Sequence, residues 1–129
     1  MKTAEVDRRS RRRQETIDEI LDVALELMAS EGVAALSLSA VARRVGMQPP
    51  SLYQYFGSKT AIYDALFQRG AEGVLAAQRT ARATVTDPAK EREVAITAFC
   101  RWCVENPVYS QLLFWRTVPG FEPSAAAFA

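Results

Sequence analysis

Apolar side chains recur every three or four positions along most of this chain, a spacing that places them on one face of a helix. The clearest run, interrupted by acidic residues, comprises Ile17, Ile20, Leu21, Ala24 and Met28. Thr16 and Glu19 have the form of a capping box, so a helix is expected over about 16–30, or from an earlier start among the arginines. Gly32 is a plausible cap at its C-terminal end. No segment alternates as a strand does, and the sequence predicts an all-α fold.

A second, shorter helix is expected before Gly46. Ser37 or Ser39 can cap its start, and Val41, Ala42 and Val45 follow at helical spacing. Glycine at position 46 permits the positive φ of a tight turn, so the helix should stop there.

A third helix is expected over about 50–56. Pro50 suits the first helical position, and Pro49 should lie outside the helix or at its edge because the residue before a proline disfavours the helical conformation. Gly57 ends this helix, and Ser58 caps another that starts at residue 59. Two short helices around a glycine turn, followed at once by a further helix, indicate a helix-turn-helix.

The remaining pattern is also helical. Gly70 and Gly73 weaken the helix that starts at residue 59, so it can bend or break there before ending near Thr84. Thr86 or Asp87 can cap a helix over 88–105, and a last helix is expected over about 108–116.

Charge is concentrated at the start of the chain. The whole sequence has 16 basic and 15 acidic residues and a net charge of +1. Residues 1–13 hold six basic and two acidic side chains, a net of +4, which leaves −3 for the rest. A basic arm on a near-neutral body is typical of nucleic-acid binding, although a solvated tail has the same composition. Residues 1–14 are therefore predicted to be a flexible basic arm whose arginines, Arg8 to Arg13, reach a minor groove or phosphates.

The third helix has the side chains of a DNA reader. The major groove is about 12 Å wide and admits one helix. Ser51 and Gln54 can reach base edges, and Pro50 can touch a thymine methyl group, while Leu52 and Phe56 should face inward. Phosphate contacts are expected from the hydroxyls of Tyr53 and Tyr55, and from Ser37, Ser39, Arg44 and Lys59. Tyr53 as a core aromatic, and Arg43, Arg44 and Lys59 as solvated side chains, remain alternatives.

The same stretch resembles the N-terminal signature of the tetracycline-repressor (TetR/AcrR) family over residues 14–67. The resemblance rests on Val41-Ala42, Val45-Gly46, Ser51-Leu52-Tyr53, Tyr55-Phe56 and Ser58-Lys59, among others. It implies a homodimer that binds a palindromic operator and is released by a small effector. In that family the positions matching Ser37, Ser39, Pro49, Ser51, Tyr53, Tyr55 and Lys59 commonly touch DNA. The Pro49-Pro50 pair departs from the family pattern and leaves fewer hydrogen-bond donors at the start of the helix.

The second half, residues 68–129, resembles the beginning of a TetR-type regulatory domain for ligand binding and dimerisation. Family members continue for further helices, so the sequence is interpreted as partial, and a chain that ended here would expose apolar faces that favour aggregation or a partner. Aromatic side chains that could line an effector pocket are Phe99, Trp102, Tyr109 and Phe114. The alternative is that they are ordinary helix-packing aromatics.

Catalytic and metal chemistry have little support in the sequence. There is no histidine, and Cys100 and Cys103 alone cannot complete a structural zinc site. Their C-x-x-C lies deep in a helical pattern, which favours two buried structural thiols over a redox pair. No apolar run approaches the roughly 20 residues that span a bilayer, and no signal peptide is expected from the polar first residues. The prediction is a cytoplasmic, non-enzymatic, effector-responsive repressor without cofactors. The alternatives are a helical interaction module that does not bind DNA and, less favoured, a thiol redox protein.

Overall fold

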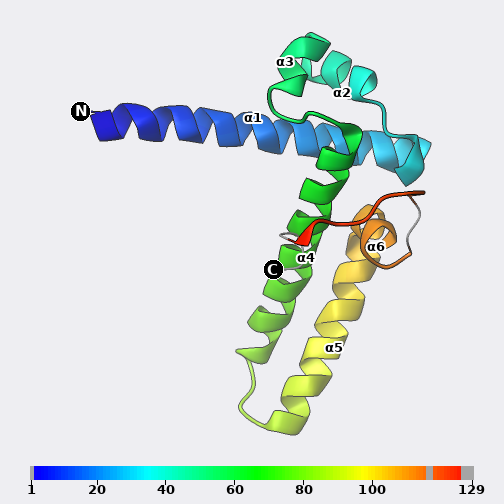
Figure 1. Cartoon of the computed structure of the whole chain (residues 1–129). Coiled ribbons are helices and arrows are strands. Elements are labelled where there is room, and N and C mark those ends of the chain that lie inside the picture. Colours follow the sequence, from blue (N-terminus) through cyan, green and yellow to red (C-terminus); the bar gives the residue numbers. More distant parts are fainter. Residues whose placement is uncertain (1, 116–117, 126–129) are drawn as a thin grey trace. The chain divides into compact units, whose positions relative to one another are not determined.

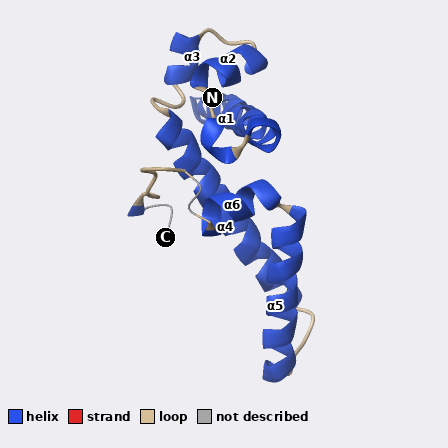
Figure 2. Cartoon of the chain, turned by 90° about the vertical axis from the view of Figure 1, so that its right-hand side faces the viewer, coloured by secondary structure: helices blue, strands red, loops and turns tan. Residues whose placement is uncertain are grey.

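The computed structural model describes residues 2–115 and 118–125 and contains only helices, turns and loops over those residues (Figures 1 and 2). The elements in chain order are α1 (Lys2–Glu31), the 3-10 turn η1 (Val33–Ala35), α2 (Leu38–Val45), α3 (Pro49–Tyr53), α4 (Lys59–Arg82), α5 (Pro88–Glu105) and α6 (Pro107–Phe114). No helix among the described residues is long and apolar enough to cross a membrane. The predicted all-α class is confirmed.

The chain divides into two compact units, Met1–Ile62 and Tyr63–Ala129, and the division falls inside α4. In the first unit α1 packs against α2, and α2 packs against α3. The buried side chains of this unit are Ile20, Leu21, Ala24, Leu27, Met28, Val33, Leu36, Val41, Ala42, Leu52, Phe56 and Ile62. The inward face predicted from the apolar periodicity is therefore the core of the helix-turn-helix.

The first helix starts much earlier than its apolar pattern predicts. It begins at Lys2, and Thr16 is not a cap, because its hydroxyl donates to the carbonyl oxygen of Arg12 at 3.0 Å inside the helix. No glycine or proline interrupts residues 2–31. Ion pairs one turn apart, between Arg9 and Glu5 and between Arg11 and Asp7, line the added turns. Residues 2–14 are thus helical where the sequence predicts an irregular arm.

The turn between α2 and α3 follows the predicted chemistry closely. The hydroxyl oxygen of Ser37 accepts from the amide of Ala40 at 3.3 Å and caps α2. Gly46 has φ +81°, and the amides of Gly46 and Met47 donate to the carbonyls of Arg43 and Ala42, which is a Schellman motif.

Two bounds of α3 differ from prediction. The helix begins at Pro49 rather than Pro50, with Gln48 as the extended residue before it, and ends at Tyr53 rather than Phe56. Pro49 takes the first position because its missing amide costs nothing there. Phe56 remains buried beyond the helix end, as expected.

In the second unit α4 runs unbroken through both glycines, so Gly70 and Gly73 do not break the helix. A side chain on Gly70 would lie 2.8 Å from Cδ1 of Tyr109, and one on Gly73 would lie 3.2 Å from Nε1 of Trp102. The glycines therefore serve close approach to α5 and α6 rather than a kink. The predicted cap of α5 is confirmed, since Asp87 accepts from the amide of Ala89 at 3.1 Å.

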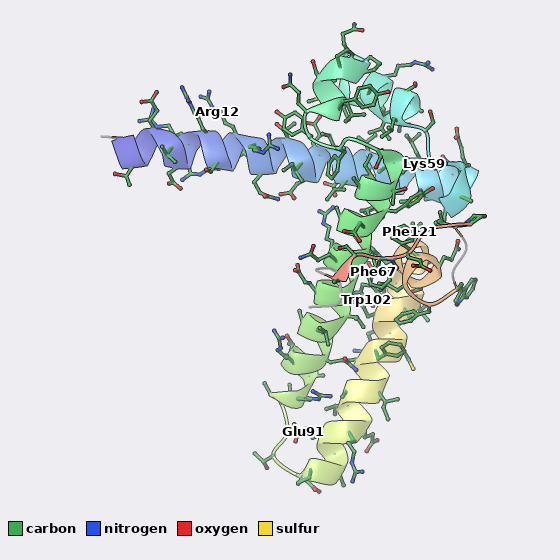
Figure 3. All side chains as sticks on the ribbon, viewed as in Figure 1. Arg12, Lys59, Phe67, Glu91, Trp102 and Phe121 are labelled. Atoms are coloured by element: carbon green, nitrogen blue, oxygen red, sulfur yellow. The ribbon has the colours of Figure 1, made fainter. Side chains whose placement is uncertain are left out.

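The end of the described chain returns to α4. Phe121 lies against Tyr63 and Phe67, with ring centroids 5.6 and 6.5 Å apart (Figure 3). The amide and hydroxyl of Ser124 donate to the two carboxylate oxygens of Asp64 at 2.6 and 2.7 Å. The α6 helix ends at Phe114 in the structure, and the predicted end at Arg116 lies outside the described residues.

Candidate nucleic-acid interface

The ten residues predicted to contact DNA all belong to the first unit, and none of them is buried. Ser37, Ser39, Arg44, Pro50, Ser51, Tyr53, Gln54 and Lys59 are exposed, and Pro49 and Tyr55 are partly exposed. Most lie on α2 and α3, which sit side by side on one side of α1 (Figure 1). The fold thus leaves all ten at the surface of the first unit.

The third helix, α3, is attached to the first unit through its apolar face. Leu52 is fully buried and Phe56 is nearly so, and the amides of Tyr55 and Phe56 both donate to the carbonyl oxygen of Leu52. A helix of five residues is too short to be stable alone, so this contact holds it in place. Ser51 and Gln54 are exposed beside it, where hydrogen-bonding side chains can reach base edges.

Two serine caps place backbone amides at helix starts near this surface. Ser37 caps α2, and the hydroxyl oxygen of Ser58 accepts from the amide of Ala61 at the start of α4. Lys59 is the first residue of α4 and is exposed. A cation beside free helix amides favours a phosphate group. Tyr53 is 50% exposed, which leaves both a phosphate contact and a half-buried aromatic as its role.

Arg44 is engaged within the unit rather than simply solvated. Its guanidinium lies 3.3 Å from a carboxylate oxygen of Glu26 on α1, and both side chains are more than half exposed. Such an exposed ion pair is worth little, at most about 1 kcal/mol, so exchange of Glu26 for a phosphate is inexpensive. Arg43 is exposed beside it.

One contact at this surface could not be found from the sequence. The guanidinium of Arg13 on α1 lies over the ring of Tyr55, 5.0 Å from its centroid. A cation over an aromatic face at that distance is attractive. The two residues are distant in the sequence and share no local pattern, so only the folded unit brings them together.

The aromatic residues predicted to line an effector pocket form two ring pairs between α5 and α6. Phe99 and Phe114 lie 5.5 Å apart, and Trp102 and Tyr109 lie 5.9 Å apart. Trp102 and Tyr109 also meet the two glycines of α4. These contacts are those of helix packing, the alternative that the sequence left open. A role in effector binding stays a prediction.

The cysteines differ from expectation. Both are free thiols, but Cys100 is exposed and Cys103 is only partly buried, so the expected pair of buried thiols is wrong. Cys100 lies one turn from the exposed Ile96 and Val104, on the outer face of α5. Among the described residues, no group of three or more His, Cys, Asp or Glu side chains could hold a metal ion.

Residues 20–66 match the family described as bacterial regulatory proteins, tetR family. The chain is 31% identical over 115 residues to the HTH-type transcriptional activator FasR of Mycolicibacterium smegmatis, a match that covers 89% of this chain and 52% of FasR. It is 34% identical over 55 residues to the HTH-type transcriptional regulator AcrR of Shigella flexneri, over 43% of this chain and 26% of AcrR.

Two solved structures are similar in fold. The regulatory protein SCO4313 has a TM-score of 0.81 and 31% identity, covering 92% of this chain and 57% of that one. A tetR family transcription regulator from Shewanella sp. PV-4 has a TM-score of 0.66 and 25% identity, covering 83% of this chain and 57% of that one. The chain therefore spans about half the length of the relatives it matches.

Proposed function

The chain belongs to the tetR family of bacterial regulatory proteins, and from that premise we propose that it binds double-stranded DNA through α2 and α3 and regulates transcription. The family is one of regulators rather than enzymes. The observation that carries the proposal is the exposed polar surface of α3, held in place by the buried Leu52. The fold does not bury Ser51, Gln54 or Tyr53, which leaves them free to meet a ligand outside the unit.

The side chains divide into two roles. Ser51 and Gln54 read base edges in the major groove, since Gln can bind adenine through two hydrogen bonds, and Pro50 contacts a thymine methyl group. Phosphates are held by Lys59 with the start of α4, by the serines of α2, by Arg44 after release of Glu26, and by the tyrosine hydroxyls. Phosphate contacts fix the position of the reader and base contacts give it specificity.

A single reader recognises only half of a palindrome, so the proposal includes a homodimer. Two α3 helices about 34 Å apart meet successive major grooves on one side of a duplex. We further propose that the protein acts in the cytoplasm as a repressor, and that a small effector bound by the second unit, near Phe99, Trp102, Tyr109 and Phe114, weakens operator binding. The relative FasR is named an activator, so a promoter-fusion assay should measure both directions of regulation.

The test is binding of the purified chain to duplexes that it selects from a random-sequence pool, measured over a salt series. Lys59→Ala should lower the slope of log K against log salt by about 0.9, with sequence preference unchanged, because one phosphate contact is lost. Lys90→Ala, an exposed lysine at the start of α5, is the control and should leave the slope unchanged.

Gln54→Ala should instead change the selected sequence, and Gln68→Ala on α4 should not. Equal losses on selected and random duplexes would remove Gln54 from base readout. If the wild-type chain retards no duplex even at low salt, DNA binding itself is wrong and a helical interaction module is favoured.

A further inference from the structure

The start of α1 carries a basic segment, residues 8–13, that holds five arginines and precedes the part matched by the family. The sequence predicts a flexible arm there, whereas the structure has a helix from Lys2. A helix fixes the direction of each side chain, because successive residues are about 100° apart around its axis. The five arginines can therefore be sorted by face.

Arg13 marks the face that points toward α3, since its guanidinium lies over Tyr55. Arg9 is one turn earlier and about 40° from Arg13 around the axis, and Arg12 is about 100° away. Arg11 is about 160° away, on the opposite side of the helix, whereas Arg8 is one turn before Arg12 and only about 40° from it. Figure 3 shows Arg12 directed to the side of α1 on which α2 and α3 lie.

The arginines near the α3 face are available for a ligand. Arg9 is 3.9 Å from Glu5, with both side chains at least 75% exposed, and such a pair is easily exchanged. Within the described part of the chain, Arg12 has no ion pair, and its side chain is exposed. On the opposite side, Arg11 is paired with Asp7 at 3.6 Å.

A helix limits how these arginines could meet DNA. An α-helix with its side chains is about 10–12 Å across, whereas the minor groove is about 6 Å wide. The helix itself cannot enter a minor groove as an extended arm would, so its arginines extend from a helix that stays outside the groove, beside the phosphate backbone. Arg9 and Arg12 lie about 4.5 Å apart along the axis of α1 and about 60° apart around it, so their side chains leave the helix close to each other.

We propose that Arg9 and Arg12 bind neighbouring phosphates of duplex DNA outside the major-groove segment met by α3. The helical start of α1 holds these arginines in fixed directions, and the contact between Arg13 and Tyr55 links α1 to the chain just after α3. This inference rests on the proposed function and extends it to a surface outside the helix-turn-helix. The inference also gives different roles to the five arginines of residues 8–13, which the composition of the sequence cannot tell apart.

The test compares two charge-matched double variants of the full chain on a duplex that the wild-type chain selects. Arg9→Ala with Arg12→Ala should lower the salt slope by about 1.8, because each lost phosphate contact removes about 0.9. Between 50 and 200 mM salt, the affinity of the wild-type chain should then fall about 12-fold more than that of the variant. Hydroxyl-radical protection should shorten at the outer edge of the site. Arg11→Ala with Lys90→Ala removes the same charge at two positions outside the proposed contact and should change neither result.

Equal effects of the two double variants would overturn the proposal, because charge alone would then explain the loss.

Ser10→Pro tests the helix separately, since it keeps every arginine but interrupts the helix between Arg9 and Arg12. It should reproduce the shortened protection, and an unchanged footprint would show that a flexible arm suffices. Circular dichroism of each variant checks that the remaining helices are intact. A wild-type chain that binds no duplex overturns the proposed function and this inference together, whereas normal wild-type binding with no effect of the Arg9 and Arg12 substitutions overturns this inference alone.

Discussion

The two compact units differ in the kind of side chain that they leave exposed. In the described part of the first unit, the large apolar side chains that are exposed are Val6 and Tyr53. In the second unit they are Leu75, Ile96, Val104, Phe114 and Trp115. The surface of the first unit is mainly polar and suits a charged ligand, whereas the second unit exposes large apolar side chains on α4, α5 and α6.

The difference follows from how each unit builds its core. The first unit buries side chains from α1, η1, α2, α3 and the start of α4, which follow one another along the chain. The second unit buries few side chains on its later helices, among them Ala95 and Leu112, and joins helices through aromatic rings and glycines. The relatives are about twice as long as the match, so the counterpart of the second unit in those proteins is one part of a longer chain. An exposed apolar surface of this kind favours association.

The prediction with the largest expected effect asks whether buried side chains account for the stability of the first unit. Leu52→Ala removes a fully buried side chain and should lower the free energy of unfolding by about 2–5 kcal/mol, because it leaves a cavity under α3. Urea unfolding followed by circular dichroism measures this change, and hydrogen exchange should show loss of protection over 38–56. Ile96→Ala on α5, where the side chain is 64% exposed, should stay within about 0.5 kcal/mol. Similar losses for both variants would contradict the contrast between the units.

The features that the sequence predicts best are those set by neighbouring residues. Ser37, Ser58 and Asp87 each accept from an amide two or three residues away, and Gly46 provides the positive φ that ends α2. Each of these features depends on only a few consecutive residues. The polar face of α3 was predictable for the same reason, because a short helix with Leu52 inward must turn its other side chains outward.

The features that the sequence does not predict depend on distant partners or on surface charge. Apolar periodicity cannot locate the start of α1, because exposed ion pairs rather than core contacts line residues 2–14. The pairing of Arg13 with Tyr55 requires the folded unit. Gly70 and Gly73 look like helix breakers until Tyr109 and Trp102 are placed beside them.

The next prediction concerns the second unit and asks whether its stability depends on the close approach of α4 to Tyr109 and Trp102. Gly70→Ala would place a methyl group 2.8 Å from Cδ1 of Tyr109 and 3.2 Å from Leu113. Overpacking costs about 1–3 kcal/mol and the gain in helix propensity offsets about 1, so a net loss of up to about 2 kcal/mol is expected. Gly73→Ala meets only the edge of the Trp102 indole at 3.2 Å, which can shift by a few tenths of an ångström, so it should be nearly neutral. Thermal unfolding followed by tryptophan fluorescence ranks the two, and a larger loss for Gly73→Ala would show that packing on α4 is not limited by Tyr109.

The smallest effect tests the local rule that ends α2 in the first unit. Gly46→Ala meets no atom within 4 Å, so any cost comes from its φ of +81°. A non-glycine residue in that conformation costs about 1 kcal/mol. Gly57→Ala is the matched control, because Gly57 is equally open and its φ is outside the left-handed region. The free energy of unfolding of this variant should stay within about 0.5 kcal/mol of the wild type.

The Schellman bonds of Gly46 and Met47 also set the direction in which the chain enters α3, so Gly46→Ala should weaken binding to the selected duplex more than Gly57→Ala does. Equal stability of the two variants would mean that the turn adapts to alanine, and the local rule that glycine at position 46 ends α2 would lose its support.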